Sequence, residues 1–207
     1  LAYNAPHSPL HAHAEDIETY RGRYRKGWAA LRRERYRRQL ELGLIRPEWA
    51  LSPQDPQAAN WDRVENKDRM DWKMAIYAAQ IECMDRNIGR VLDLLRERGE
   101  LDNTLVLFLS DNGACAETGP LGFDGRGGNN GTLGTVDSYS SYGRSWSNAS
   151  NTPFRLHKSY VHEGGIATPL VARWPGHIPP GSITHEVGHV IDIMPTCCEL
   201  AGAEYPE

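Results

Sequence analysis

The chain has 207 residues, of which 40% are hydrophobic, 9% aromatic and 24% charged, an ordinary globular composition. Its formal net charge of −4 argues against a dedicated nucleic-acid-binding protein. No run approaches the roughly 18 apolar residues that predict a membrane span. The first residues, LAYN, include neither a Met nor a signal peptide. We therefore expect a piece of a longer polypeptide, whose compartment stays open, periplasmic or secreted included.

Residues 15–43 have the period of an amphipathic helix, with aromatic and aliphatic side chains three and four positions apart. Between Arg21 and Arg38 there are nine Lys or Arg and a single acid, Glu34. Such a helix either presents a solvated cationic face or binds a polyanion, and the pattern favours the solvated face. Residues 44–69 contain three prolines among polar residues, which predicts a loop.

A second helix is predicted to begin at Asp71, with an apolar stripe from Met74 to Leu95 that faces a core. Gly99 is expected to end it as a C-terminal cap. The apolar run at residues 104–109 is typical of a strand buried on both faces, as in parallel sheets covered by helices. The order helix, turn, buried strand indicates an α/β fold.

The sequence patterns of the remaining elements are less distinct. Residues 113–153 form a Gly-, Ser- and Asn-rich loop of a length that is often functional. Strands are expected at 167–174 and near Val187, followed by a closing helix that begins near Asp192 or Pro195. The four cysteines lack C-x-x-C spacing, which argues against a structural zinc site and favours buried free thiols.

Polar side chains follow the predicted buried strand directly, in the sequence Ser110-Asp111-Asn112-Gly113. Ligands of open α/β sheets bind at the carboxyl ends of strands. The carboxylate of Asp111 and the amide oxygen of Asn112 are hard ligands of the kind that Ca²⁺ or Mg²⁺ prefers. The alternative is that Asp-Asn-Gly merely turns the chain.

A second candidate is the H-E-x-x-H sequence at residues 185–189, the pattern of zinc proteases. That zinc site requires His185 and His189 on one face of a helix. The preceding prolines and Gly188 disfavour a helix there. We therefore expect these histidines to have a packing or supporting role.

Several blocks of sequence, in order and at matching spacing, resemble the sulfatase family in its bacterial arylsulfatase branch. They are residues 4–12, 77–95 with 109–113, 147–155 with Lys158 and 163–165, and 188–196. Ordered blocks are more specific than any single motif. The resemblance implies a three-layer α/β/α fold of the alkaline-phosphatase type, with a mostly parallel buried sheet, and hydrolysis of sulfate esters of small molecules or glycans.

The resemblance also implies roles by position. Asp111 and Asn112 match part of a metal site for Ca²⁺ or Mg²⁺, Lys158 matches the lysine that contacts the sulfate, and His7 matches the histidine at the bridging oxygen. These roles are chemically consistent, because a cation and an ammonium reduce the repulsion between an anionic ester and its nucleophile. An imidazole serves as general acid near neutral pH.

The family's nucleophile is a formylglycine made inside a C/S-x-P-x-R motif, and none of the four cysteines begins that pattern. The acidic metal ligands of the family's first strand are missing too. The resemblance therefore implies that residues 1–207 are a partial sulfatase catalytic domain, without its N-terminal nucleophile-bearing part and C-terminal subdomain. The isolated segment is expected to be inactive, and its partner is the remainder of the same polypeptide.

Three polar residues near Lys158 are expected to support it: Arg155, His162 and Glu163. Residues 119–148 are expected to border the substrate cleft, with Tyr142 and Trp146 as candidates for contact with an aromatic substrate. A phosphonate monoester or phosphodiester hydrolase stays open as an alternative, as does a non-catalytic fragment.

Overall fold

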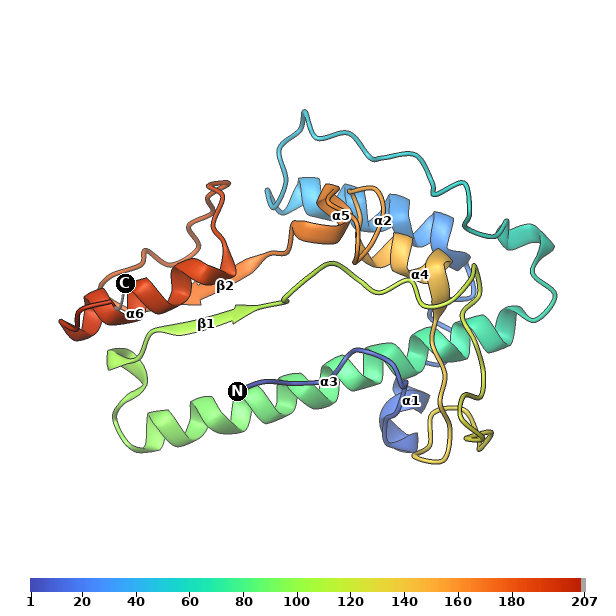
Figure 1. The fold of residues 1–207 in the computed structure, drawn as a ribbon, viewed down its shortest axis with the longest axis horizontal. Coiled ribbons are helices and arrows are strands. Elements are labelled where there is room, and N and C mark those ends of the chain that lie inside the picture. Colours follow the sequence, from blue (N-terminus) through green and yellow to red (C-terminus); the bar gives the residue numbers. More distant parts are fainter. Residues whose placement is uncertain (206–207) are drawn as a thin grey trace.

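A computed structural model describes residues 1–205. One long helix, α3, runs beside a two-stranded sheet, with α2 and α4 near one end of the molecule and α6 near the other (Figure 1). The helices are α1 (Ala14–Tyr20), α2 (Gly27–Glu41), α3 (Lys67–Glu97), α4 (Gly143–Ser150), α5 (Glu163–Ile166) and α6 (Ile193–Ala201). The strands are β1 (Val106–Leu109) and β2 (Leu170–Arg173), and short 3-10 turns lie at Trp61–Arg63, Leu101–Asn103 and Val190–Asp192. Among the described residues, every helix is too short or too polar to cross a bilayer.

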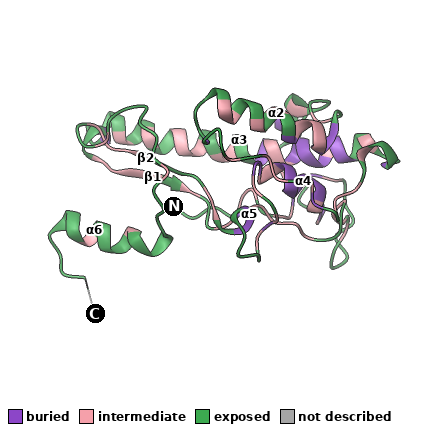
Figure 2. Ribbon diagram, turned by 90° about the horizontal axis from the view of Figure 1, so that it is seen from above, coloured by how far each residue is buried: buried purple, intermediate pink, exposed green. Residues whose placement is uncertain are grey.

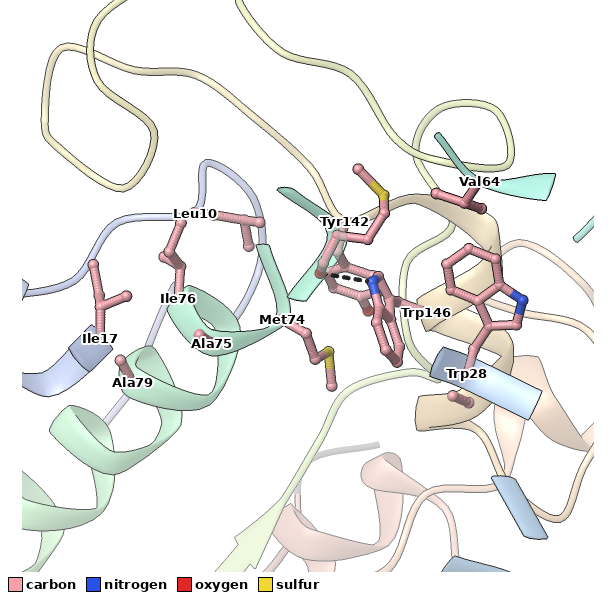
Figure 3. Packing of buried hydrophobic residues seen from close by; sticks show 12 residues of the cluster. Leu10, Ile17, Trp28, Val64, Met74, Ala75, Ile76, Ala79, Tyr142 and Trp146 are labelled. Atoms are coloured by element: carbon pink, nitrogen blue, oxygen red, sulfur yellow. Dashed lines mark hydrogen bonds between the residues drawn. The ribbon is translucent and has the colours of Figure 1, made fainter. Parts of the chain in front are cut away.

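The hydrophobic core lies around the first half of α3 (Figures 2 and 3). Trp146 of α4 is fully buried there, and its indole N–H donates to the backbone oxygen of Met70 at 3.1 Å. The rings of Trp28 and Trp146 meet edge to face at 5.3 Å. Tyr142 is buried in the same cluster. The expectation that Tyr142 and Trp146 contact substrate is therefore wrong, because both side chains hold the core together.

The basic segment forms two helices, where the sequence predicts one. The carboxylate of Asp71 accepts the backbone N–H groups of Gly22 and Tyr24, each at 2.7 Å, which fixes the turn between α1 and α2. Asp71 is 2% exposed and lies inside α3, which begins at Lys67 after the cap Asn66. Local periodicity misses this break because the residue that causes it lies about fifty positions along the chain. Most basic side chains of the segment face solvent, as expected.

The apolar stripe of α3 is covered along only half its length. Met74 at the start of the stripe is buried, whereas Ile81 and Val91 further along it are exposed. Figure 2 shows the same change from buried to exposed along the helix. Gly99 has φ +71°, which confirms the predicted glycine cap just beyond the helix.

The sheet differs from the sequence prediction. β1 pairs with β2 in antiparallel register, from Val106 opposite Arg173 to Leu109 opposite Leu170, as a two-stranded sheet within the described residues. Phe108 is 44% and Val171 59% exposed. The expected parallel, doubly buried strand is therefore wrong for this pair. An apolar run does not determine the direction of the partner strand, and no described element covers the exposed faces of Phe108 and Val171.

The predictions for two further segments differ from the structure. The loop predicted at 113–153 contains α4, whose buried face docks on the core. The strand expected near Val187 is irregular chain, and Val187 is exposed. The closing helix is present as α6, starting at Ile193.

The Asp71 contact gives a test of the fold. Asp71→Ala leaves two backbone N–H groups without their charged acceptor, and we expect it to lower the free energy of unfolding by roughly 2–4 kcal/mol. Urea unfolding followed by tryptophan fluorescence measures the change. The control is Asp68→Ala in the same helix, whose ion pair with Arg25 is exposed and is worth at most about 1 kcal/mol. Equal losses in both variants would contradict the assigned role of Asp71.

Candidate functional site

Two distant backbone segments dock at the carboxyl end of β1. The N–H of Gly113 donates to the oxygen of Gly165 at 2.9 Å, and the N–H of Lys158 donates to the oxygen of Ala114 at 3.1 Å. A Cβ at Gly113 would lie 1.9 Å from the oxygen of Gly164, so the contact has no room for a side chain. The docking therefore places Lys158 beside the loop that carries Asp111 and Asn112.

Lys158 and His7 face each other across this region. Their Nζ and Nε2 atoms are 3.4 Å apart, although the residues are separated by 151 positions. The other ring nitrogen of His7 lies 2.8 Å from the backbone oxygen of Ser8, so it carries the proton and donates it. The unprotonated Nε2 then faces the ammonium. A separation of 3.4 Å leaves no room for an atom between the two nitrogens, so a ligand oxygen reaches both from beside the pair.

Asp111 and Asn112 lie next to each other on this loop. The amide NH₂ of Asn112 donates to a carboxylate oxygen of Asp111 at 3.1 Å and to the oxygen of Gly113 at 3.3 Å, so its carbonyl oxygen is not the atom engaged in these bonds. Asp111 is exposed. Three residues span at most about 11 Å, so Asp111 stays close to Ala114 and its partner Lys158.

These two residues fit part of a site for a hard cation. Ca²⁺ takes six to eight oxygen ligands, and Asp111 and Asn112 offer one carboxylate and one neutral oxygen. The donor chemistry therefore fits Ca²⁺ or Mg²⁺, and a full shell needs further oxygens.

A pocket of about 300 Å³ lies beside Lys158, lined also by Cys115, Glu117 and Arg144.

His7, Cys115 and Glu117 bring possible metal-ligating atoms within 4.8 Å of one another. The Lys158 ammonium lies 3.4 Å from the Nε2 of His7 and opposes a cation beside that ring. Burial raises the pKa of the Cys115 thiol, which keeps it protonated and unreactive. The cationic groups suit an oxyanion better than a metal ion.

Sequence reasoning missed these lining residues. Cys115 and Glu117 lie within four residues after the Asp-Asn-Gly motif, so their position near it was a usable signal. Arg144 gave none, because it comes from α4, a helix that the sequence pattern does not predict.

The other predicted residues lie outside the His7–Lys158 contact. Arg155, His162 and Glu163 are exposed, and Glu163 begins α5. The cysteines are free, but Cys197 is exposed and the other three are only half-buried, so the expectation of buried thiols is wrong.

The H-E-x-x-H residues do not form a helix. The ring of His185 packs edge to face on Trp49 at 4.9 Å. The Nδ1 of His189 accepts the N–H of Ile191 at 3.2 Å and caps the turn that leads into α6. The predicted packing role is confirmed for His185, whereas His189 is exposed and has a capping role that the sequence did not predict; the geometry of a zinc protease is not formed.

The sulfatase family model matches residues 1–203. The chain is 40% identical to an uncharacterised sulfatase of Schizosaccharomyces pombe, over all of this chain and 39% of that protein. It is 34% identical to an arylsulfatase of Klebsiella aerogenes, over 99% of this chain and 46% of that protein. The solved structure of Ps i-CgsB in complex with k-i-k-neocarrahexaose superposes with a TM-score of 0.56 and 25% identity, over all of this chain and 29% of that one. The chain thus spans less than half the length of these relatives, and it belongs to the sulfatase family.

Proposed function

We propose that this chain is part of an enzyme that hydrolyses sulfate esters, as an arylsulfatase does. The observation that carries the proposal is the 3.4 Å approach of Lys158 Nζ to His7 Nε2 beside the Asp111–Asn112 loop. The two groups differ in chemistry, since one is a fixed cation and the other an acid–base group. A sulfate ester presents both an anionic group and a bridging oxygen, which these two side chains suit.

Lys158 binds the sulfate oxygens through its ammonium. Its positive charge offsets the negative charge that repels an incoming nucleophile. The hydrogen bond from its backbone N–H to the Ala114 oxygen holds Lys158 beside the end of β1, so the side chain extends from a fixed backbone position.

His7 moves the proton. The hydrogen bond to the Ser8 oxygen holds one proton on Nδ1. Nε2 takes up a second proton from water once the anionic sulfate lies against it and Lys158, because the charge of the sulfate offsets the repulsion between the imidazolium and the ammonium. As the sulfur–oxygen bond of the ester breaks, the departing alcohol oxygen receives that proton from Nε2, and the ring returns to its neutral form.

Asp111 and Asn112 would hold Ca²⁺ or Mg²⁺ together with ligands from the remainder of the polypeptide. When bound, the cation supplies charge neutralisation at the sulfate. The formylglycine nucleophile is proposed to lie in that remainder too. The exposed side chains of Phe108 and Val171 and the uncovered half of α3 support a larger domain that covers them. We propose that this domain is a three-layer α/β/α fold with a mostly parallel sheet, in which β1 and β2 are an antiparallel pair.

The proposed reaction is tested with the full-length protein, 4-nitrophenyl sulfate and Ca²⁺. We expect release of 4-nitrophenol, lost on chelation of the metal and restored by Ca²⁺ or Mg²⁺. Absorbance at the nitrophenolate band measures the rate. Cleavage of a phenyl phosphonate or a phosphodiester in place of the sulfate would move the assignment to that sister activity, and cleavage of none would indicate a non-catalytic chain.

Lys158→Ala tests the sulfate contact. We expect kcat/KM to fall by about 10²–10³, as when one stabilising donor is removed from a transition state. Steady-state kinetics on 4-nitrophenyl sulfate give the value. Lys26→Ala, an exposed lysine paired with Glu34, is the matched control and should leave the rate unchanged. A Lys158 variant as active as this control would refute the role.

His7→Ala tests the proton donor through the leaving group. An alkoxide needs a proton as it departs, whereas a nitrophenolate does not. We therefore expect the variant to lose at least tenfold more kcat/KM on an alkyl sulfate than on 4-nitrophenyl sulfate. The two rates, measured by sulfate release, give the ratio. Equal losses on both esters would show that His7 only binds.

A further inference from the structure

A buried network of side-chain hydrogen bonds lies behind Lys158. None of its members has a role in the proposed reaction. Asp55 Oδ2 lies 2.7 Å from His157 Nε2, and His157 Nδ1 lies 2.8 Å from Ser147 Oγ. The Ser147 hydroxyl lies 3.0 Å from the backbone oxygen of Ala114, to which it donates. His157 and Ser147 are 0% exposed. The order Ser–His–Asp is that of a hydrolase triad, but a hydroxyl closed off from solvent cannot attack a substrate.

The last hydrogen bond of this network is made to Ala114, the residue whose backbone contacts Lys158. The Ala114 oxygen that receives the Ser147 hydroxyl also accepts the N–H of Lys158, and the N–H of Ala114 donates to Asn151 at 2.8 Å. The buried His157 immediately precedes Lys158 in sequence. The same buried group therefore holds both partners of the backbone contact that positions Lys158.

The backbone on both sides of this pair is strained. Leu156 has φ +66° and Ser159 has φ +79°, in the left-handed region that costs a side-chain-bearing residue roughly 1–2 kcal/mol. Such conformations persist only where the surroundings hold them. The anchor between the two strained residues is the fully buried ring of His157.

Proton counting shows that the three bonds are coupled. The Ser147 hydroxyl has one proton, so it donates to Ala114 only if His157 Nδ1 supplies a proton to Ser147. If Nε2 also donates to Asp55, the ring is an imidazolium. With a neutral ring that donates to Asp55, Ser147 must divide its proton between Ala114 and His157.

Three charged groups surround this ring. Asp55 faces Nε2, Arg144 lies 3.4 Å from the same carboxylate oxygen, and Arg32 adds a weaker attraction to Asp55. Burial is the largest influence on the pKa of His157 and lowers it, Asp55 raises it, Arg144 lowers it, and the net shift is downward. The fold therefore favours the neutral ring, in which the Ser147 hydroxyl divides its proton between the Ala114 oxygen and His157 Nδ1.

We propose that Asp55, His157 and Ser147 form a buried positioning network for Lys158 and the Ala114 carbonyl. The network touches no substrate. It acts by fixing the backbone position from which the Lys158 side chain extends and the path of the loop that carries Asp111 and Asn112. This inference rests on the proposed role of Lys158 in sulfate binding.

The test uses the full-length protein and the variants Ser147→Ala, His157→Gln and their double. Ser145→Ala is the matched control, because Ser145 is a buried serine of the same helix α4 whose hydroxyl accepts the N–H of Ala59 at 2.9 Å, a bond that is not one of the three network bonds. We expect each network variant to lower kcat/KM on 4-nitrophenyl sulfate by about tenfold or more. The double variant should lose little beyond either single change, since the residues act as a unit. The control should lose stability without this loss of rate.

A second readout does not depend on activity. In protein with ¹³C-dimethylated lysines, the Lys158 resonance is assigned by its absence in Lys158→Arg. We expect Ser147→Ala and His157→Gln to shift or broaden it, and Ser145→Ala to leave it in place. Asp55→Asn, which keeps the side-chain volume, carries the same expectation where a larger change unfolds the protein.

The outcomes separate the two proposals. A wild-type protein without sulfatase activity refutes the proposed function, while the Lys158 resonance still reports on the network. Network variants that leave this resonance unmoved, or move it no more than the control does, overturn the positioning role.

Stability against pH gives an additional check. A histidine whose pKa is lowered by folding binds a proton more readily when unfolded, so its contribution to stability is present above about pH 6.5 and is lost as the pH falls towards the folded pKa. We expect the melting temperature of the wild type to fall over this range, and the fall to be smaller in His157→Gln than in Ser145→Ala. An identical pH dependence in both variants would count against the buried neutral ring.

Discussion

The candidate site depends on the close approach of two backbones at the carboxyl end of β1. Gly113 leaves no room for a side chain against Gly164, and hydrogen bonds at Gly113 and Ala114 join the strand end to residues 158 and 165. Without this contact Lys158 would have no fixed relation to Asp111. Because the contact is made by backbone atoms, its position is set by chain geometry, and the side chains that project from it can serve chemistry.

Much of the local structure could be predicted from the sequence, because it follows from periodicity. The long helix α3, its glycine cap at Gly99 and the apolar run of β1 were all readable. The break between α1 and α2 was not, since it is imposed by the distant carboxylate of Asp71. Nor could an apolar run disclose that β1 pairs antiparallel with β2.

The candidate site also contains residues that the sequence identified and residues that it did not. The resemblance to sulfatases picked out His7 and Lys158, and the structure brings their side chains together, while their catalytic roles and those of Asp111 and Asn112 stay predictions. The network behind Lys158 was invisible, because Asp55 and His157 are 102 positions apart and neither stands in a recognisable motif. Trp146 shows the opposite error, since an aromatic residue near a predicted cleft proved to be core.

The distribution of burial agrees with a chain that shares its fold with further polypeptide. The core is concentrated at one end, whereas β1, β2 and α6 present apolar side chains to solvent (Figure 2). The positions of His7 and Lys158 are nevertheless fixed within this chain, by contacts that it makes with itself.

A crystal structure of the full-length protein with inorganic sulfate and Ca²⁺ tests the central claim most directly. We expect sulfate oxygens within hydrogen-bonding distance, about 3 Å, of Lys158 Nζ and His7 Nε2, with the cation on Asp111 and Asn112. Sulfate bound elsewhere, or a Lys158 side chain directed away from His7 and the bound ion, would contradict it.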